Sequence, residues 1–187
     1  MKIENEFEVA ASPETAWDLL MDVPRVVPCM PGATLDEVVD DSTWKATMQV
    51  KLGPIGLTFA ADVHREEVDE VARRVKLATT ARETRNRGRA QATISSTLVP
   101  LDGCTKVELV TDLTLSGTVA QYGRGMIQDI SAQLVGSFAD CLQAQLAAAP
   151  EEAREAVASQ AKPVAGLSLF FGALRRALTR LIGRRPR

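Results

Sequence analysis

The chain has 187 residues, of which 45% are hydrophobic and 25% are charged. This is the usage of an ordinary globular domain, which excludes a disordered or collagen-like chain, and the length is sufficient for a core without a disulfide or a structural metal. Aromatic residues make up only 4%. Any internal cavity must therefore be lined mainly by aliphatic side chains and Met. The single histidine, His64, excludes a multi-histidine metal site.

The three cysteines, Cys29, Cys104 and Cys141, lie far apart in the sequence. No pair has the spacing of a zinc knuckle or a redox motif, and an odd number argues against a secreted disulfide framework. We therefore expect Cys29 to be a small, buried apolar residue. The first residues are too acidic and polar for a signal peptide, so we expect a cytoplasmic protein with reduced thiols.

The net charge of −2 conceals a strong asymmetry. Residues 161–187 carry seven basic residues and no acid, whereas residues 1–160 carry a formal charge of −9. A basic tail on an acidic body is typical of a segment that binds an anionic surface. The acidic body itself is unsuited to nucleic acid.

The first half of the chain predicts a strand, short helices and then a series of strands. Residues 2–10 alternate apolar and polar positions, and Ser12, Pro13 and Glu14 are a typical helix start. Prolines allow only short helical turns over residues 23–30. Strand-like alternation follows at residues 35–39, 43–52, 55–63, 71–79, 90–99 and 107–115. Tight turns between these runs indicate an antiparallel meander with one covered face.

The covering element is predicted at residues 118–148, where apolar residues recur at spacings of three and four. A polar, Ala- and Glu-rich segment follows at residues 150–163 and is interpreted as a linker. Residues 164–187 form a second amphipathic stretch. The predicted domains are therefore residues 1–149, the linker 150–163 and the tail 164–187.

Several short segments, weak singly but ordered together, resemble the CoxG family of carbon monoxide dehydrogenase proteins, in the START-like superfamily, over residues 1–147. They are Met1-Lys2-Ile3-Glu4 with Phe7-Glu8-Val9, Trp17, Cys29-Met30-Pro31-Gly32, Val50-Lys51-Leu52-Gly53-Pro54, Asp102-Gly103 with Thr105, and Gly117-Thr118-Val119-Ala120-Gln121 with Gly123 and Met126-Ile127. The resemblance implies an α+β helix-grip fold: a curved seven-stranded antiparallel sheet wrapped around a long C-terminal helix, with two short helices after the first strand. It implies no catalytic residue.

The resemblance also favours a ligand pocket between sheet and helix over a simple packed core, because helix-grip helices often stand off from the sheet. Pockets of this kind are mostly apolar. Thr111, Tyr122 and Ser137 are candidate polar groups. The predicted lining residues, chosen by their inward position, are Met48, Phe59, Leu77, Ile94, Thr111, Leu113, Tyr122, Met126, Ile130 and Leu134.

One run of basic residues departs from the family pattern. Arg82, Arg85, Arg87 and Arg89 lie where the family tends to be rich in Gly and Ala, at a predicted hairpin tip. Two interpretations stay open: a solvated turn, or a contact for an acidic partner or membrane phosphates.

The tail predicts an interfacial helix that inserts its apolar face into a membrane and directs arginines to lipid phosphates. Its uninterrupted apolar run of 11 residues, 164–174, is too short to span a ~30 Å hydrocarbon core. Docking of this helix on the acidic body or on a partner is the alternative. The predicted membrane contacts are Leu167, Phe170, Phe171, Leu174, Arg175, Arg176, Leu178 and Arg180.

These features predict a non-enzymatic carrier, peripherally bound to the inner face of the cell membrane. The resemblance implies that its ligand is a menaquinone-type quinone and that its partner is a molybdenum-containing carbon monoxide dehydrogenase or a related hydroxylase. The chain carries no motif for a metal, flavin or haem. The alternatives are an anchor that recruits the dehydrogenase without a ligand, a carrier of another lipid or hydrophobic small molecule, and a START-like cyclase or hydrolase.

Overall fold

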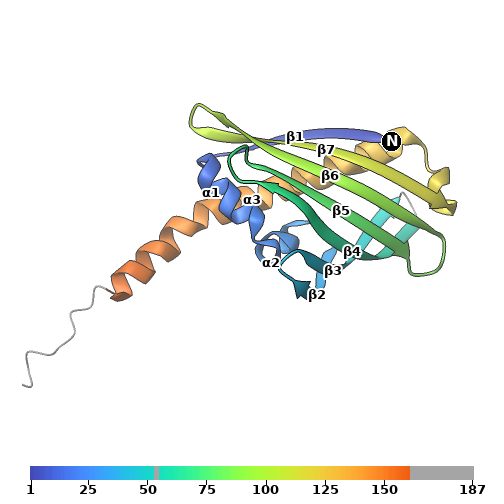
Figure 1. Ribbon diagram of the computed structural model, residues 1–187, viewed down its shortest axis with the longest axis horizontal. Coiled ribbons are helices and arrows are strands. Elements are labelled where there is room, and N and C mark those ends of the chain that lie inside the picture. Colours follow the sequence, from blue (N-terminus) through green and yellow to red (C-terminus); the bar gives the residue numbers. More distant parts are fainter. Residues whose placement is uncertain (53–54, 161–187) are drawn as a thin grey trace, which may run out of the picture. The chain divides into compact units, whose positions relative to one another are not determined.

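The computed structural model describes residues 1–52 and 55–160. A single antiparallel sheet, a long helix and short helices make up the body (Figure 1). In chain order the elements are β1 (Lys2–Val9), α1 (Pro13–Met21), α2 (Val23–Val26), η1 (Val27–Cys29), β2 (Ala33–Asp40), β3 (Thr43–Leu52), β4 (Ile55–Asp69), β5 (Arg74–Glu83), β6 (Gly88–Leu101), β7 (Cys104–Gly117), η2 (Thr118–Gln121) and α3 (Arg124–Gln160).

The seven strands lie in the order β1-β7-β6-β5-β4-β3-β2, and every neighbouring pair is antiparallel. Strands β2 to β7 form a meander, and β1 closes it at the β7 edge. Figure 1 shows the curvature of the sheet and helix α3 on one of its faces. The predicted α+β helix-grip fold is confirmed, including the short helices after the first strand.

Local sequence explains the start of α1. Ser12 caps the helix by accepting a hydrogen bond from the Thr15 amide at 3.2 Å, and Pro13 occupies the first turn. A cap of this kind contributes about 1 kcal/mol. The helix then buries Ala16, Trp17 and Leu19.

Several boundaries differ from the sequence prediction. Strand β4 continues to Asp69. The sequence pattern ends earlier because a bulge between Arg65 and Glu67 shifts the register and interrupts the two-residue alternation. Strands β5 and β6 reach Glu83 and Gly88, so the turn between them is shorter than predicted.

The long helix begins at Arg124 rather than at residue 118. Gly117, with φ +77°, turns the chain out of β7, a conformation that favours glycine. The Thr118 hydroxyl and the Val119 amide then donate to the Arg87 carbonyl, at 2.8 and 3.3 Å. Residues 118–121 are thus held as a 3₁₀ turn against the β5–β6 turn.

The buried residues form two separate clusters. The first surrounds α1 and includes Leu19, Val107 and Leu142; the second consists of Leu57 and Val119 with partly buried neighbours. The first is tightly packed, since the space between its apolar side chains admits no water-sized sphere. The two clusters occupy different parts of the interface between sheet and helix.

Helix α3 is fastened along the β1 edge and the short helices. Asn5 donates to the Ser131 hydroxyl at 2.9 Å, and Phe7 meets Phe138 edge to face with ring centroids 5.9 Å apart. Further along, the Gln143 side chain accepts from the Ala10 amide at 2.7 Å. These contacts all lie on the β1 side of the helix.

A disulfide joins Cys29 of η1 to Cys141 of α3. The expectation of unpaired cysteines is therefore wrong for these two residues, while Cys104 is free. Cys29 is nevertheless buried within the first cluster, as predicted for a small apolar residue. The error arises because a separation of 112 residues in the sequence gives no indication that the helix returns to η1.

The chain divides by its contacts into two units, Met1–Ala148 and Ala149–Arg187. Helix α3 extends to Gln160 and so runs through most of the segment interpreted as a linker. The tail, residues 164–187, and the predicted turn at 53–54 lie outside the described residues, and the three-part domain division stays a prediction. Within the described ranges, no helix has an apolar stretch long enough to cross a bilayer.

Candidate ligand-binding site

A row of four small side chains crosses the middle of the sheet. Ala46 of β3 is the register partner of Ala61 of β4, which pairs with Ala81 of β5, which pairs with Ala90 of β6. We call these four residues the alanine row. Leu115 of β7 is the partner of Ala90 and ends the row on that side.

The alanine row lies on the face of the sheet that α3 covers. Alternate residues of a strand share a face, so Ala61 faces the same way as Phe59. Phe59 packs in the second cluster with Ile130 of α3. The four alanines are only half-buried, although a helix covers their side of the sheet. Four methyl groups in a line take up less space than larger side chains would, and we call this strip of the inner face the trough.

The rows on either side of the trough carry larger side chains, except for Ala92. Met48 and Phe59 are register partners on one side, and Phe59 in turn pairs with Glu83. On the other side a row made of Val63, Thr79, Ala92 and Leu113 crosses strands β4 to β7. The trough is therefore an apolar strip bordered by one hydroxyl, that of Thr79, and one carboxylate, that of Glu83.

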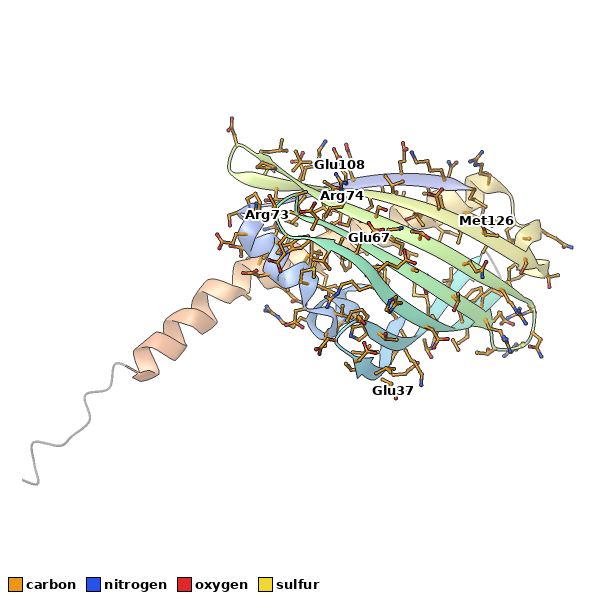
Figure 2. All side chains as sticks on the ribbon, in the orientation of Figure 1. Glu37, Glu67, Arg73, Arg74, Glu108 and Met126 are labelled. Carbon is orange, nitrogen blue, oxygen red and sulfur yellow. A yellow bond between two sulfur atoms is a disulfide. The ribbon has the colours of Figure 1, made fainter. Side chains whose placement is uncertain are left out.

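None of the ten predicted lining residues belongs to the fully buried core. Phe59, Tyr122 and Ile130 pack against the second cluster, and Leu77 packs against the first. The other six belong to neither cluster: Met48, Ile94, Thr111, Leu113, Met126 and Leu134. Met126 is 43% exposed and lies near the start of α3, at the end opposite the Arg73–Arg74 turn (Figure 2). Their role as a pocket lining stays a prediction.

The candidate polar groups are placed differently from one another. Thr111 and Tyr122 are half-buried, and Thr111 lies on the inner face as the register partner of Ile94. Ser137 is exposed. Within the described residues, no group of three His, Cys, Asp or Glu side chains is placed to hold a metal ion.

An ion pair that sequence reasoning missed lies at the border of the trough, beside Phe59. The Glu83 side chain is buried, and its carboxylate accepts from the Arg85 and Arg87 amides at 2.8 and 3.1 Å and from the Arg87 guanidinium at 2.8 Å. Arg87 also donates to the Gly56 carbonyl at 2.7 Å, so the group ties the β5–β6 turn to β4.

This environment fixes the charge of Glu83. The hydrogen bond from Arg87, supported by the two backbone amides, lowers the pKa of Glu83 to about 2. The same bond raises the pKa of Arg87. Glu83 lies within the arginine run, directly after Arg82, and the run resembles a solvated turn in sequence. Only the fold shows that the Glu83 side chain is buried.

Comparison with known proteins identifies the family. A model of the G-subunit family of carbon monoxide dehydrogenase (CoxG) matches residues 6–147. The chain belongs to the CoxG family. A search of curated proteins found no match.

Several solved structures have a fold similar to that of this chain. A conserved protein from Geobacillus kaustophilus is 21% identical with a TM-score of 0.70, covering 79% of this chain and 95% of that chain. A START superfamily protein from Mycobacterium smegmatis is 16% identical with a TM-score of 0.52, covering 78% and 96%. The ZhuI aromatase/cyclase from Streptomyces sp. R1128 is 13% identical with a TM-score of 0.57, covering 79% and 94%. At these identities the likeness shows the fold alone, which is a START-like fold.

Proposed function

We propose that this CoxG-family protein is a non-enzymatic carrier of a menaquinone-type quinone. It takes the quinone from the membrane into the space along the alanine row and presents it, as electron acceptor, to a molybdenum-containing carbon monoxide dehydrogenase or a related hydroxylase. The alanine row is the observation that carries the proposal. An apolar strip under a covering helix replaces the lipid as solvent for an isoprenoid ligand.

The packing of the interior supports a ligand rather than a continuous core. The two buried clusters are separate, and six predicted lining residues lie in neither cluster. Fully apolar cores of this size normally form one contiguous cluster. A bound quinone would fill the space between them and bury these half-exposed side chains.

The chemistry of the inner face supports a carrier over a cyclase or hydrolase. A general base works best with a pKa near the working pH. Glu83, the carboxylate at the border of the trough, is held ionised by Arg87 with a pKa of about 2. Glu83 is therefore a weak base, and its hydrogen bonds hold the β5–β6 turn in place. The enzymatic activities named for structural neighbours, such as the aromatase/cyclase, are not proposed for this chain.

Delivery from the membrane assigns a role to the tail. We place the protein in the cytoplasm, with residues 164–187 bound to the inner membrane face through Leu167, Phe170, Phe171 and neighbouring arginines. Insertion of apolar side chains and attraction of arginines to anionic lipid would both contribute.

Mass spectrometry of an organic extract from the purified full-length protein tests the function. The expected result is a quinone with an isoprenoid tail, and uptake of added menaquinone by protein prepared without it. If the extract contains no lipid and added quinone causes no thermal shift, the carrier proposal is wrong. Membrane recruitment of the dehydrogenase without a ligand would then be the better account. Recovery of a different lipid would favour a general lipid carrier.

A further inference from the structure

A hollow of about 560 Å³ is lined by the four residues of the alanine row and by eight residues that point to the outer face of the sheet. The residues on either side of each alanine point the other way, because side chains alternate along a strand. The outer-face lining consists of Asp36, Lys45, Ala60, Asp62, Thr80, Arg82, Arg89 and Gln91. Ala60 is the one residue of this outer-face set with no polar side chain. We call this hollow the outer hollow.

Two arginines face each other across neighbouring strands in the outer hollow. Arg82 of β5 and Arg89 of β6 are register partners. Like charges directly opposite each other in a sheet are destabilising. Within the described part of the chain, neither guanidinium forms an ion pair, and both residues are exposed. Both lie within strands, so the predicted placement of these two residues at a hairpin tip is wrong.

The opposite side of the outer hollow has a different charge pattern. Lys45 is held by Glu37 at 2.7 Å, and Asp36 accepts from the Thr47 hydroxyl at 2.8 Å. Asp62 is the register partner of Lys45. Acids therefore gather at the β2–β4 side and unpaired arginines at the β5–β6 side. A uniformly anionic membrane surface would be attracted at one side and repelled at the other.

We infer that the outer hollow is the docking site for the dehydrogenase named in the proposed function, through a surface segment that places acidic side chains between Arg82 and Arg89. The inference rests on that proposed function. A protein surface can present acids to the arginines and a base to Asp36 and Asp62, which gives orientation as well as attraction. The body of this chain is otherwise acidic, so the arginine pair also steers an acidic partner to this face.

The position of the outer hollow links docking to the ligand. Arg82 and Arg89 lie one residue inside β5 and β6, next to the β5–β6 turn and to the Glu83–Arg87 ion pair at the border of the inner trough. The alanine row belongs to both sites, because its four residues also line the outer hollow. A partner seated on the arginines therefore reaches the rim of the proposed ligand chamber.

Biolayer interferometry between the full-length protein and the purified dehydrogenase tests the docking site. Arg82→Glu with Arg89→Glu is expected to weaken binding by about tenfold or more, since reversed charges repel the partner acids. The matched control, Arg25→Glu with Arg74→Glu, makes the same change of charge on exposed residues outside the outer hollow and should stay within about twofold. Arg82→Gln with Arg89→Gln guards against a folding defect caused by the reversed charges. This variant should lose less affinity for the dehydrogenase, and its affinity should depend less on salt than that of the unmodified protein.

Quinone content is measured on the same samples, which separates this proposal from the carrier function. Loss of docking with quinone retained supports the outer hollow. Unchanged affinity in both Arg82/Arg89 variants would overturn the docking site while leaving the carrier function standing, and so would an equal loss in the control. Undetectable binding by the unmodified protein would overturn both the docking site and the proposed partner. If the Arg82/Arg89 variants weaken binding to anionic vesicles and not binding to the dehydrogenase, the outer hollow is a membrane contact and the docking proposal is wrong.

Discussion

Removing the Cys29–Cys141 disulfide should lower stability strongly. The bridge closes a loop with a sequence separation of 112 residues, and a loop of that length loses much of its freedom in the unfolded state. A chain-entropy calculation gives a stabilisation of about 4.8 kcal/mol at 25 °C. For a chain of this size, the corresponding fall in melting temperature is roughly 10–20 °C. The variant Cys29→Ala with Cys141→Ala tests this value without burying a new polar group.

The assay compares thermal unfolding of the double variant with that of the intact protein and of Cys104→Ala. Cys104 is the free cysteine, so its replacement should leave the melting temperature nearly unchanged. Alkylation of the denatured protein without reductant counts the free thiols first. Labelling of all three cysteines would show that the bridge is absent. If the bridge is present and the double variant still melts within about 2 °C of the intact protein, the loop-closure reasoning is refuted.

Three further outcomes are expected. Glu83→Gln should destabilise the β5–β6 turn and flatten the fall in stability at acid pH. The pKa of Glu83 is about 2 in the folded protein against an ordinary 4.5, so the carboxylate stabilises the fold fully above the unfolded pKa and progressively less as the pH falls towards 2. Thermal unfolding measured across that pH range checks this. Met126→Trp should cost little stability, because Met126 is 43% exposed, yet it should reduce quinone uptake. If the free energy of unfolding instead falls by about the 1–3 kcal/mol of an overpacked core while quinone uptake is intact, Met126 lies outside the ligand chamber. Truncation after Ala149 should leave a folded, soluble protein that no longer sediments with anionic vesicles, and equal sedimentation of both forms would make the membrane interpretation of residues 164–187 wrong.

The tail prediction can be resolved further into its two physical contributions. Arg175→Glu with Arg176→Glu should weaken vesicle binding and flatten its salt dependence, since each basic residue contributes about 1 kcal/mol near anionic lipid. Phe170→Ser with Phe171→Ser should weaken binding at every salt concentration, because apolar insertion is not screened. Identical effects of the two pairs would argue against an interfacial helix.

Much of the fold could be predicted from local sequence. The alternation over residues 43–52 corresponds to β3 without change, and Ser12 with Pro13 marks the start of α1. These features depend on neighbouring residues only. The end of β4 was not predictable, because a single bulged residue between Arg65 and Glu67 breaks the alternation.

The candidate site depended on contacts between distant residues. The four alanines are ordinary small residues in four separate strands, and only the register of β3 to β6 aligns them. The Cys29–Cys141 bridge likewise requires the return path of α3. Glu83 resembles any acid in a charged turn until the strand directions show that it faces inward. Sequence periodicity indicates which face of a strand or helix a residue occupies, but not which distant residue it contacts.

The central claim is that the space along the alanine row holds the quinone. Ala81→Leu projects a larger side chain into the trough, whereas Ala78→Leu adds the same atoms to the same strand on the outer face. Trp44 provides the signal, because it lies two residues from Ala46 on the same face of β3, and Trp44→Phe identifies its share of the fluorescence from the two tryptophans.

The decisive measurement is the titration of menaquinone into both leucine variants, followed by quenching of Trp44 fluorescence. Ala81→Leu is expected to lose most quinone binding while remaining folded, and Ala78→Leu to bind quinone like the unmodified protein. Equal binding by the two variants, with quenching retained, would contradict a ligand chamber on the inner face of the sheet.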